Sequence, residues 1–137
     1  MTYKLLVWLF LALPYFAQKT KAPAIIVNAF EKAFPGATKI SWDKEKDDYE
    51  VNFTFNTKQM AAVYNKQALL KETEETIAVT ALPATVTAYI SQHYPKAVIR
   101  EAAKITLPGG AINYEAEVNK KDFIFDASGK FLRAQND

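Results

Sequence analysis

The 137-residue sequence contains no cysteine, a single histidine and only four glycines. Without cysteine, a disulfide framework, a thiol nucleophile and a cysteine-ligated metal site are all excluded. A chain of this length with 50% hydrophobic and 13% aromatic residues can form one core without a disulfide or structural metal. The formal net charge of +2 gives no electrostatic case for binding nucleic acid or an anionic membrane. No cofactor is expected.

The N-terminal segment, residues 1–17, predicts a signal peptide. Lys4 is a short basic region, residues 5–13 are an apolar run, and Pro14 interrupts that run before Ala17. The run is too short for a membrane-spanning helix, which needs roughly 20 apolar residues. We therefore expect export to the periplasm or secretion, with cleavage after Ala17. A spacer over residues 18–22 would then precede a single domain over residues 23–137. An uncleaved N-terminal anchor is the alternative.

A tetrad of similar sequence occurs twice, at residues 34–37 and 94–97. Each copy follows a segment with the apolar periodicity of a helix, and its proline is expected to end that helix. The apolar residues of the two helices correspond at the same offset, with Ile26, Phe30 and Phe34 matching Val86, Ile90 and Tyr94. The sequence therefore predicts two tandem repeats, over about residues 23–72 and 82–134.

Each predicted helix, over residues 23–34 and 83–94, is followed by an antiparallel meander. Residues 49–56 alternate apolar and polar side chains, as a strand with one buried and one wet face requires. Further strands are expected over residues 37–43, 59–64, 69–72, 98–106, 113–119, 121–126 and 130–133, with residues 73–76 as a polar connector. The fold class is α+β: the two repeats form one sheet, with two helices packed on one face.

Two local details of the meanders can be predicted. In the first strand, Thr38, Ile40 and Trp42 are expected on one face. Gly129 is expected to adopt a positive φ in the last hairpin, whereas its counterpart Ala68 either pays a steric cost or uses another turn.

Few residues are candidates for catalysis or metal binding. His93 lacks a nucleophile motif, so we expect it to interact with carbonyl groups at the end of a helix. An acidic group at one turn comprises Asp43, Asp47, Asp48 and Glu50, but its spacing does not fit an EF-hand and lysines are interleaved. Glu115 and Glu117 alternate on one strand without a cleft, which disfavours an acid–base pair. We expect no enzymatic activity and no metal.

Most aromatic residues fall on the predicted inward faces of the strands and are assigned to the core. Trp42 is the exception to watch, because its indole N–H requires a partner and a strand-edge tryptophan often lies at a binding surface.

The sheet face without helices is the remaining candidate for binding. Its expected mixture of polar and apolar side chains suits a protein or peptide partner, although an ordinary solvated sheet face has the same pattern. The residues are Lys39, Ser41, Glu50, Asn52, Thr54, Val63, Glu115, Glu117, Asn119 and Ile124.

The order of these motifs resembles the PepSY-like, β-lactamase-inhibitor-protein-like family, small secreted proteins of Bacteroidetes-type bacteria built from two repeats. The residues that carry the resemblance are Phe34-Pro35-x-Ala37, Ile40-x-Trp42, Tyr49-x-Val51-x-Phe53, Val63-Tyr64-Asn65, Leu82-Pro83 and Tyr94-Pro95-x-Ala97. The resemblance covers about residues 23–134. The sequence departs from the family at Ala68, where glycine is frequent, and at Ala102, where the second copy lacks a counterpart of Trp42.

The resemblance implies a helix-and-sheet architecture, a secreted or periplasmic location and no established enzymatic activity. We therefore expect a non-enzymatic binding module that acts as an inhibitor of, or a partner for, an envelope hydrolase or another protein. The alternative is a structural, envelope-associated domain without inhibitory activity. No motif matches the contact residues of a β-lactamase inhibitor, so inhibition of a β-lactamase is not implied.

Overall fold

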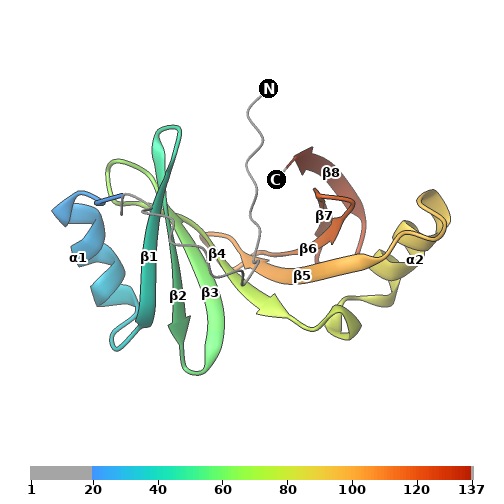
Figure 1. Ribbon diagram of the computed structural model, residues 1–137, viewed down its shortest axis with the longest axis horizontal. Coiled ribbons are helices and arrows are strands. Elements are labelled where there is room, and N and C mark those ends of the chain that lie inside the picture. The colour runs from blue at the N-terminus through green and yellow to red at the C-terminus, as the bar shows by residue number, and fades with distance from the viewer. Residues whose placement is uncertain (1–19, 137) are drawn as a thin grey trace, which may run out of the picture. The chain divides into compact units, whose positions relative to one another are not determined.

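A computed structural model of the protein describes residues 20–136, so the predicted signal peptide lies outside the described residues. The helices are α1 (Ala24–Ala33) and α2 (Ala84–His93), with a 3₁₀ turn at Val79–Ala81. The strands are β1 (Thr38–Glu45), β2 (Asp48–Phe55), β3 (Lys58–Tyr64), β4 (Leu70–Ile77), β5 (Ile99–Thr106), β6 (Ile112–Val118), β7 (Lys121–Asp126) and β8 (Phe131–Asn136) (Figure 1). The sheet has eight strands in chain order, which confirms the α+β class.

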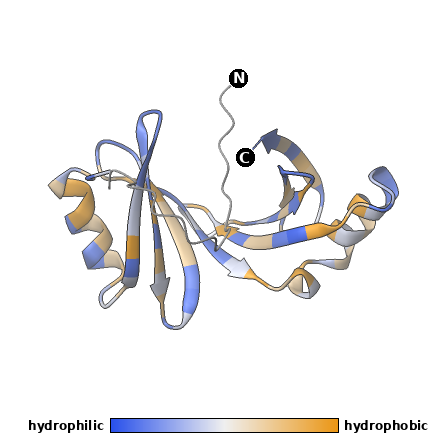
Figure 2. Cartoon of the chain, viewed as in Figure 1, coloured by the Kyte–Doolittle hydropathy of each residue, from blue (hydrophilic) through white to orange (hydrophobic). Residues whose placement is uncertain are grey.

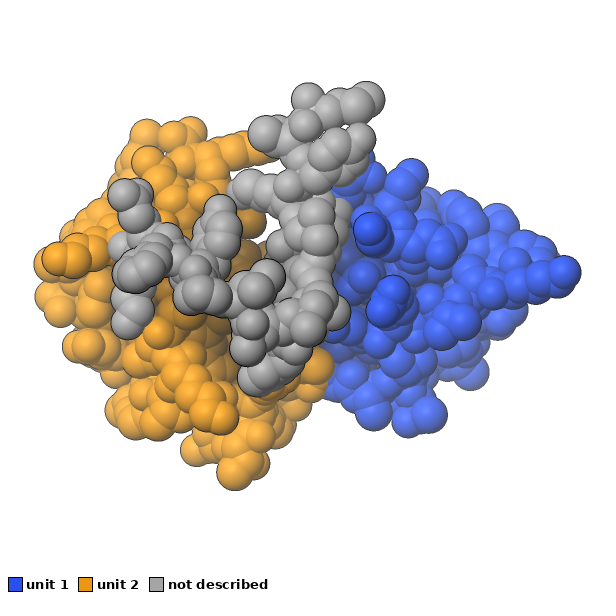
Figure 3. Space-filling model, viewed as in Figure 1, with its two compact units in different colours: residues 1–18, 77–103, 113–137 blue, residues 19–76, 104–112 orange. Residues whose placement is uncertain are grey.

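The chain forms two compact units, coloured separately in Figure 3. The first unit along the described chain contains residues 19–76 and 104–112 and is orange, keyed as unit 2, in Figure 3. The second contains residues 77–103 and 113–137 and is blue, keyed as unit 1. The two helices therefore belong to different units, and each helix has its own apolar core. The expectation that both helices cover the same face of the sheet stays a prediction.

In the first unit, α1 packs on one face of β1, β2 and β3. Ile26 and Phe30, one helical turn apart, are buried against Val51 of β2 and Ala62 of β3. Figure 2 shows α1 as a mostly apolar ribbon interrupted by polar residues. Burying a side chain such as Phe30 contributes about 1.5–3 kcal/mol. The alternation predicted for residues 49–56 is therefore confirmed, because the apolar side chains of this strand pack into the core under α1.

In the second unit, α2 makes the equivalent contact with β6 and β7. Val86 and Ile90 are buried against Ala116, Val118 and residues of β7. The helix bounds differ from those of α1 by sixty residues at both ends, since α1 spans residues 24–33 and α2 spans residues 84–93. The predicted duplication is therefore present in the backbone as well as in the sequence.

The two tetrads end the helices in the same way. Phe34 donates its backbone N–H to the Phe30 carbonyl at 2.9 Å, and Tyr94 donates to the Ile90 carbonyl at 2.8 Å. The third residue of each tetrad then has a positive φ, which is 84° at the glycine and 67° at Lys96. The tetrads thus terminate each helix and redirect the chain, as predicted.

The β3–β4 and β7–β8 turns also have matching backbones. Ala68 donates to the Asn65 carbonyl, and Gly129 donates to the Asp126 carbonyl, both at 2.9 Å. Both donors are left-handed, with φ of 62° at Ala68 and 83° at Gly129. The first repeat therefore keeps the turn and accepts the steric cost at alanine.

Side chains brace the same two turns. The Oδ1 of Asn65 accepts hydrogen bonds from the backbone N–H groups of Gln67 and Leu69. In the second turn, Asp126 Oδ1 accepts the equivalent bonds from Ser128 and Lys130. Asp126 also accepts the Ser128 hydroxyl at 2.7 Å. The hydrogen bond from this hydroxyl is the main cause that lowers the pKa of the Asp126 carboxyl, and the bond from the Lys130 backbone N–H is the second.

Tyr64 carries a polar atom into the core of the first unit. The residue is buried, and its hydroxyl has no hydrogen-bond partner among the described residues. Burial raises the pKa of this phenol above its ordinary value of 10.0. At the equivalent position of the second unit, sixty-one residues on, Phe125 is buried without a hydroxyl. The fold therefore requires the ring at this position but not the oxygen.

Two strand predictions are wrong in part. The β1–β2 register shifts between Thr38 and Ser41, and Lys39 has a φ of 52°, so a bulge breaks the expected alternation. Ile40 consequently remains exposed instead of joining Trp42 on the inward face. The expected connector at residues 73–76 is part of β4, where Glu75 forms an ion pair with Lys58 of β3 at 2.8 Å.

Candidate interaction surfaces

In the first unit, the strand face opposite α1 consists of cross-strand rows. One row joins Ser41 of β1, Asn52 of β2 and Ala61 of β3, and continues to Glu74 of β4. Thr54, two residues from Asn52, lies opposite Gln59. We call this face, and its counterpart opposite α2 in the second unit, the helix-free face.

A second row on this face contains Glu50 and Val63, which are cross-strand neighbours. Glu50 is only 8% exposed, and its Oε1 accepts a hydrogen bond from the Asn52 amide at 3.0 Å. Val63, Asn52 and Thr54 are half-buried. The exposure expected for Glu50 is therefore wrong, although the residue lies on the predicted face of β2.

In the second unit, Glu115 lies opposite Ile124, which lies opposite Arg133 of β8. Glu115 and Glu117 are half-buried, and each has an interaction partner. Ile124 is 0% exposed, so the expectation that it would lie at the surface is wrong. Period-2 alternation assigns a side chain to a face but does not say how well its neighbours cover it.

Two predicted face residues lie at irregular backbone positions. Lys39 forms the bulge of β1, and Asn119 follows the end of β6 with a φ of 52°. Asparagine tolerates the left-handed conformation better than most residues, which explains its place in the β6–β7 turn. Both side chains are exposed, but neither continues a regular row of the sheet.

His93 lies in the last turn of α2 and interacts locally. Its Nδ1 lies 2.9 Å from the carbonyl oxygen of Tyr89, and the two rings stack with centroids 4.0 Å apart. The predicted contact with a helix-end carbonyl is confirmed. Among residues 20–136, no group of three histidine, aspartate or glutamate side chains is arranged to hold a metal ion.

The acidic turn and Trp42 also have structural neighbours. Asp48 forms an ion pair with Lys71 of β4 at 2.5 Å. Trp42 is half-buried and packs edge-on against Phe30, with ring centroids 5.5 Å apart. The Trp42 ring is therefore part of the first core rather than a free binding platform.

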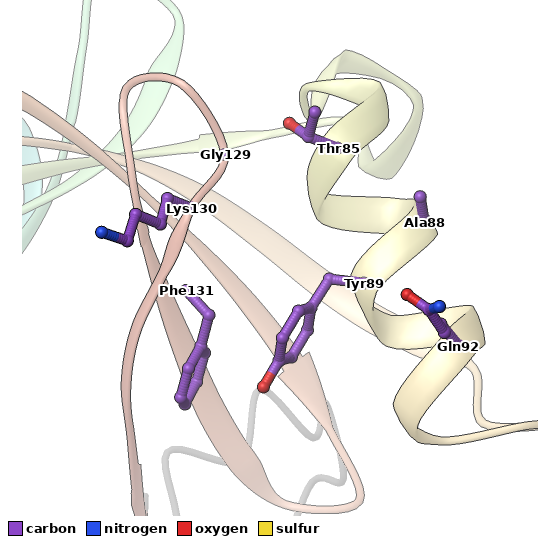
Figure 4. Close-up of a pocket in the computed structure, with 7 residues that line it drawn as sticks. All are labelled: Thr85, Ala88, Tyr89, Gln92, Gly129, Lys130 and Phe131. Atoms are coloured by element: carbon purple, nitrogen blue, oxygen red, sulfur yellow. The ribbon is translucent and has the colours of Figure 1, made fainter.

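A groove in the second unit was not predicted. It has a volume of about 410 Å³ and lies between α2 and the start of β8. Figure 4 shows its lining residues, with the Tyr89 and Phe131 rings side by side and the Lys130 side chain directed away from α2. The remaining lining residues are Thr85, Ala88, Gln92 and Gly129.

Close contacts join the two sides of the groove. The Thr85 hydroxyl donates to the Ser128 carbonyl at 2.9 Å, which ties α2 to the β7–β8 turn. A Cβ on Gly129 would lie 1.7 Å from the Thr85 hydroxyl oxygen, so only glycine permits this approach. Tyr89 is held between His93 and Phe131, whose ring lies nearly parallel at 10°.

Comparing the repeats position by position could have identified this groove. Ala29 and Leu70 of the first repeat correspond to Tyr89 and Phe131, so aromatic rings line the site only in the second repeat. Such differences between duplicated halves indicate positions that the common fold does not determine.

The comparison with protein families finds one match, described as beta-lactamase-inhibitor-like and PepSY-like, over residues 15–70 and 47–133. These segments cover most of the chain. The chain belongs to this PepSY-like family. The comparison with curated proteins finds no match.

Several solved structures share the PepSY-like fold of this chain. A protein from Bacteroides eggerthii with a provisional assignment to the periplasm is 21% identical, covering 85% of this chain and 90% of its own, with a TM-score of 0.73. A DUF2874 family protein from Bacteroides uniformis is 19% identical over 85% and 90%, with a TM-score of 0.72. A BLIP-like protein from Bacteroides fragilis is 21% identical over 85% and 86%, with a TM-score of 0.63.

At these identities the solved structures show a common fold and do not transfer a binding site to this PepSY-like chain. Within residues 20–136, no helix has the length and apolar character needed to cross a membrane.

Proposed function

We propose that this protein is an exported, non-enzymatic module that binds a protein partner of the cell envelope through its helix-free face. The PepSY-like family and the provisional periplasmic assignment of one structural relative support export. The kind of partner that we propose is an envelope hydrolase, which the module restrains by occupying its surface. The beta-lactamase-inhibitor-like description of the family and the BLIP-like relative support this class of role without identifying the hydrolase.

One observation carries the proposal. Within each unit, a helix packs against one face of the strands and leaves the opposite face without a helix, where polar side chains lie beside Val63 in the first unit and beside the buried Ile124 in the second. In the first unit, that face presents Ser41, Asn52, Thr54 and Val63 close together on neighbouring strands. A sheet surface with both hydrogen-bonding and apolar groups suits a protein partner better than a small ligand.

The buried members of the face have a supporting role in this proposal. Glu50 accepts the Asn52 amide and thereby holds one rotamer of that side chain. Ile124, which lies sixty-one residues after Val63 and corresponds to it in the second unit, is fully buried. The contact residues that we propose are Ser41, Asn52, Thr54 and Val63 of the first unit. Glu115 and Glu117 are the polar residues of the second unit's own helix-free face and are proposed for a contact of that unit.

Site-specific photo-crosslinking in the native host tests this assignment. A photoreactive residue is placed at Thr54 on the helix-free face and, as a matched control, at Glu31 on the exposed side of α1. We expect a discrete, saturable cross-link from position 54 and none from position 31. The cross-linked protein is then purified, and its affinity for the exported module is measured by calorimetry.

Substitution of the contact residues separates a specific interface from chance proximity. Asn52→Arg should weaken binding about tenfold or more, because it places a large charge within the contact, whereas Glu31→Arg should change affinity less than about twofold. If the partner is a hydrolase, its turnover should fall in proportion to complex formation. Equal cross-linking from both positions, or none from either, contradicts the proposal and favours a structural envelope-associated domain.

A further inference from the structure

The groove beside Tyr89 lies next to an open edge of the sheet. β8 is the last strand in the strand order, and within residues 20–136 only β7 pairs with it. An edge strand carries backbone N–H and C=O groups that a further strand can bond. Phe131, the first residue of β8, and Lys130 before it line one side of the groove, and α2 forms the other (Figure 4). A backbone template and a side-chain pocket therefore occur together.

The first repeat shows what such an edge accepts. β4 is the counterpart of β8, since the two strands begin at Leu70 and Phe131, sixty-one residues apart. In the strand order β4 has β5 as its second neighbour, and residues 104–106 of β5 belong to the same unit as β4. The strand that follows the duplicated turn can therefore pair on both sides. In the second repeat, the place that corresponds to β5 is open among the described residues.

The edge of β8 is short and carries little charge. Residues 133–136 pair with β7 in an unbroken register, and an extra residue, Leu132, forms a bulge between these pairs and Phe131. Arg133 is the only charged residue of the strand, and it lies in the row of Glu115 on the helix-free face. On the α2 side, an added strand therefore meets no charged residue of β8.

The groove presents ring edges to a ligand. The Tyr89 ring is stacked between His93 and Phe131, so both of its faces are covered. The positive edge of an aromatic ring attracts the face of another. Lys130 is the only charged lining residue, and Asp126, the nearest acidic residue in the sequence, already accepts hydrogen bonds from N–H and O–H groups of its own turn. The groove therefore suits an aromatic side chain with an acidic neighbour.

We propose that the edge of β8 and the groove together bind an extended peptide segment of another protein, which joins the sheet as a further strand. Its backbone pairs with β8, one aromatic side chain enters the groove beside Phe131, and an acidic neighbour lies near Lys130. A second copy of the chain fits less well. When all six residues of two β8 strands pair about a two-fold axis, Phe131 faces Asn136, whose amide does not fill an aromatic groove. This site is separate from the contact residues of the helix-free face and does not rest on that proposal.

Selection from a library of random displayed peptides tests the site on the protein purified after export. Ala88 is exposed on α2 and lines the groove, so Ala88→Glu fills the groove and repels an acidic peptide without altering a core. Asn28→Glu, at the corresponding exposed position of α1, is the matched control. Selected peptides should share an aromatic residue beside an acidic one, and should bind Ala88→Glu about tenfold or more weakly but Asn28→Glu within about twofold of the unmodified protein. No selected sequence, or equal binding to all three proteins, overturns the proposal.

Backbone measurements distinguish strand addition from a contact of side chains alone. N-methylation of a selected peptide should weaken binding about tenfold or more at every second position and little at the positions between, because alternate N–H groups of a strand face the same neighbour. Binding should also slow amide hydrogen exchange at alternate residues within 131–136. Tolerance of N-methylation at every position, or unchanged exchange in β8, overturns the proposal. Self-association of the free protein that slows the same β8 amides also overturns it, since the edge would then pair copies of this chain.

Discussion

Replacing Tyr64 by phenylalanine would remove a single oxygen atom from the core of the first unit. That oxygen is buried without a hydrogen-bond partner, and an unsatisfied buried hydroxyl costs about 1–3 kcal/mol relative to one solvated in the unfolded chain. The ring and its packing remain in the variant, as the buried Phe125 of the second unit illustrates. We expect Tyr64→Phe to raise the free energy of unfolding by about 1 kcal/mol and the melting temperature by roughly 3–6 °C.

Tryptophan fluorescence during urea unfolding provides a unit-specific measurement. Trp42 is the only tryptophan in residues 20–136, and its indole packs against Phe30 in the first core. The midpoint of the transition should move to higher urea concentration with an unchanged slope, because the surface exposed on unfolding hardly changes.

The reverse substitution in the second unit is the matched control. Phe125 is fully buried, with the Tyr89 ring 5.4 Å away and the Phe131 ring 5.9 Å away. Phe125→Tyr should therefore destabilise the protein by about 1–3 kcal/mol, through overpacking and an added buried hydroxyl. A loss of stability in Tyr64→Phe would refute the reasoning, since it would mean that the Tyr64 hydroxyl is paired in solution, for example by a buried water.

Alkaline pH provides an independent test of the same group. Burial holds the folded-state pKa of Tyr64 above 10.0, so the unfolded chain loses this proton first as the pH rises. The stability associated with the neutral phenol is complete below pH 10 and is lost as the pH rises through the folded-state pKa. Tyr64→Phe should remove this part of the alkaline decline, and an unchanged decline would show that other groups cause it.

Three further predictions concern the paired turns. Gly129→Ala should destabilise the protein by about 3 kcal/mol in urea unfolding, because the new methyl group would collide with Thr85 and φ is positive; a loss below about 1 kcal/mol would contradict this. Ala68→Gly should stabilise it by about 0.5–1 kcal/mol by relieving left-handed strain, and destabilisation would mean that chain entropy dominates. Asp126 has a pKa below 3.8, so its stabilising effect is present above that pH and is lost as the pH falls through the folded-state pKa. Asp126→Asn, which copies Asn65, should keep the turn and flatten stability between pH 5 and pH 2; an unchanged acid slope would exclude this carboxyl as its source.

Sequence periodicity was sufficient to predict the helices, their termination and the duplication. Ile26 and Phe30 recur as Val86 and Ile90 because a helix that packs on a sheet must present one apolar stripe at a fixed spacing. Pro35 and Pro95 then mark the ends, since the residue before a proline avoids the helical conformation. These are local constraints, and they are visible in a single sequence.

Other features depend on neighbours that a single strand does not reveal. The bulge at Lys39 adds one residue to β1 relative to β2 and thereby reverses the faces expected before it. Ile124 is buried on a face that alternation marks as outward, because burial depends on the residues across the sheet. The groove beside Tyr89 requires the approach of Thr85 to Gly129, which no spacing rule predicts.

The bulge in β1 also bears on solubility. β1 is an edge strand of the sheet, and a flat edge exposes unpaired N–H and C=O groups to other chains. The positive φ at Lys39 bends this edge, and Asp43, Lys44 and Glu45 add charges of both signs along it. A strand from another molecule pairs poorly in register along such an edge, so the irregularity that exposes Ile40 also disfavours edge-to-edge aggregation.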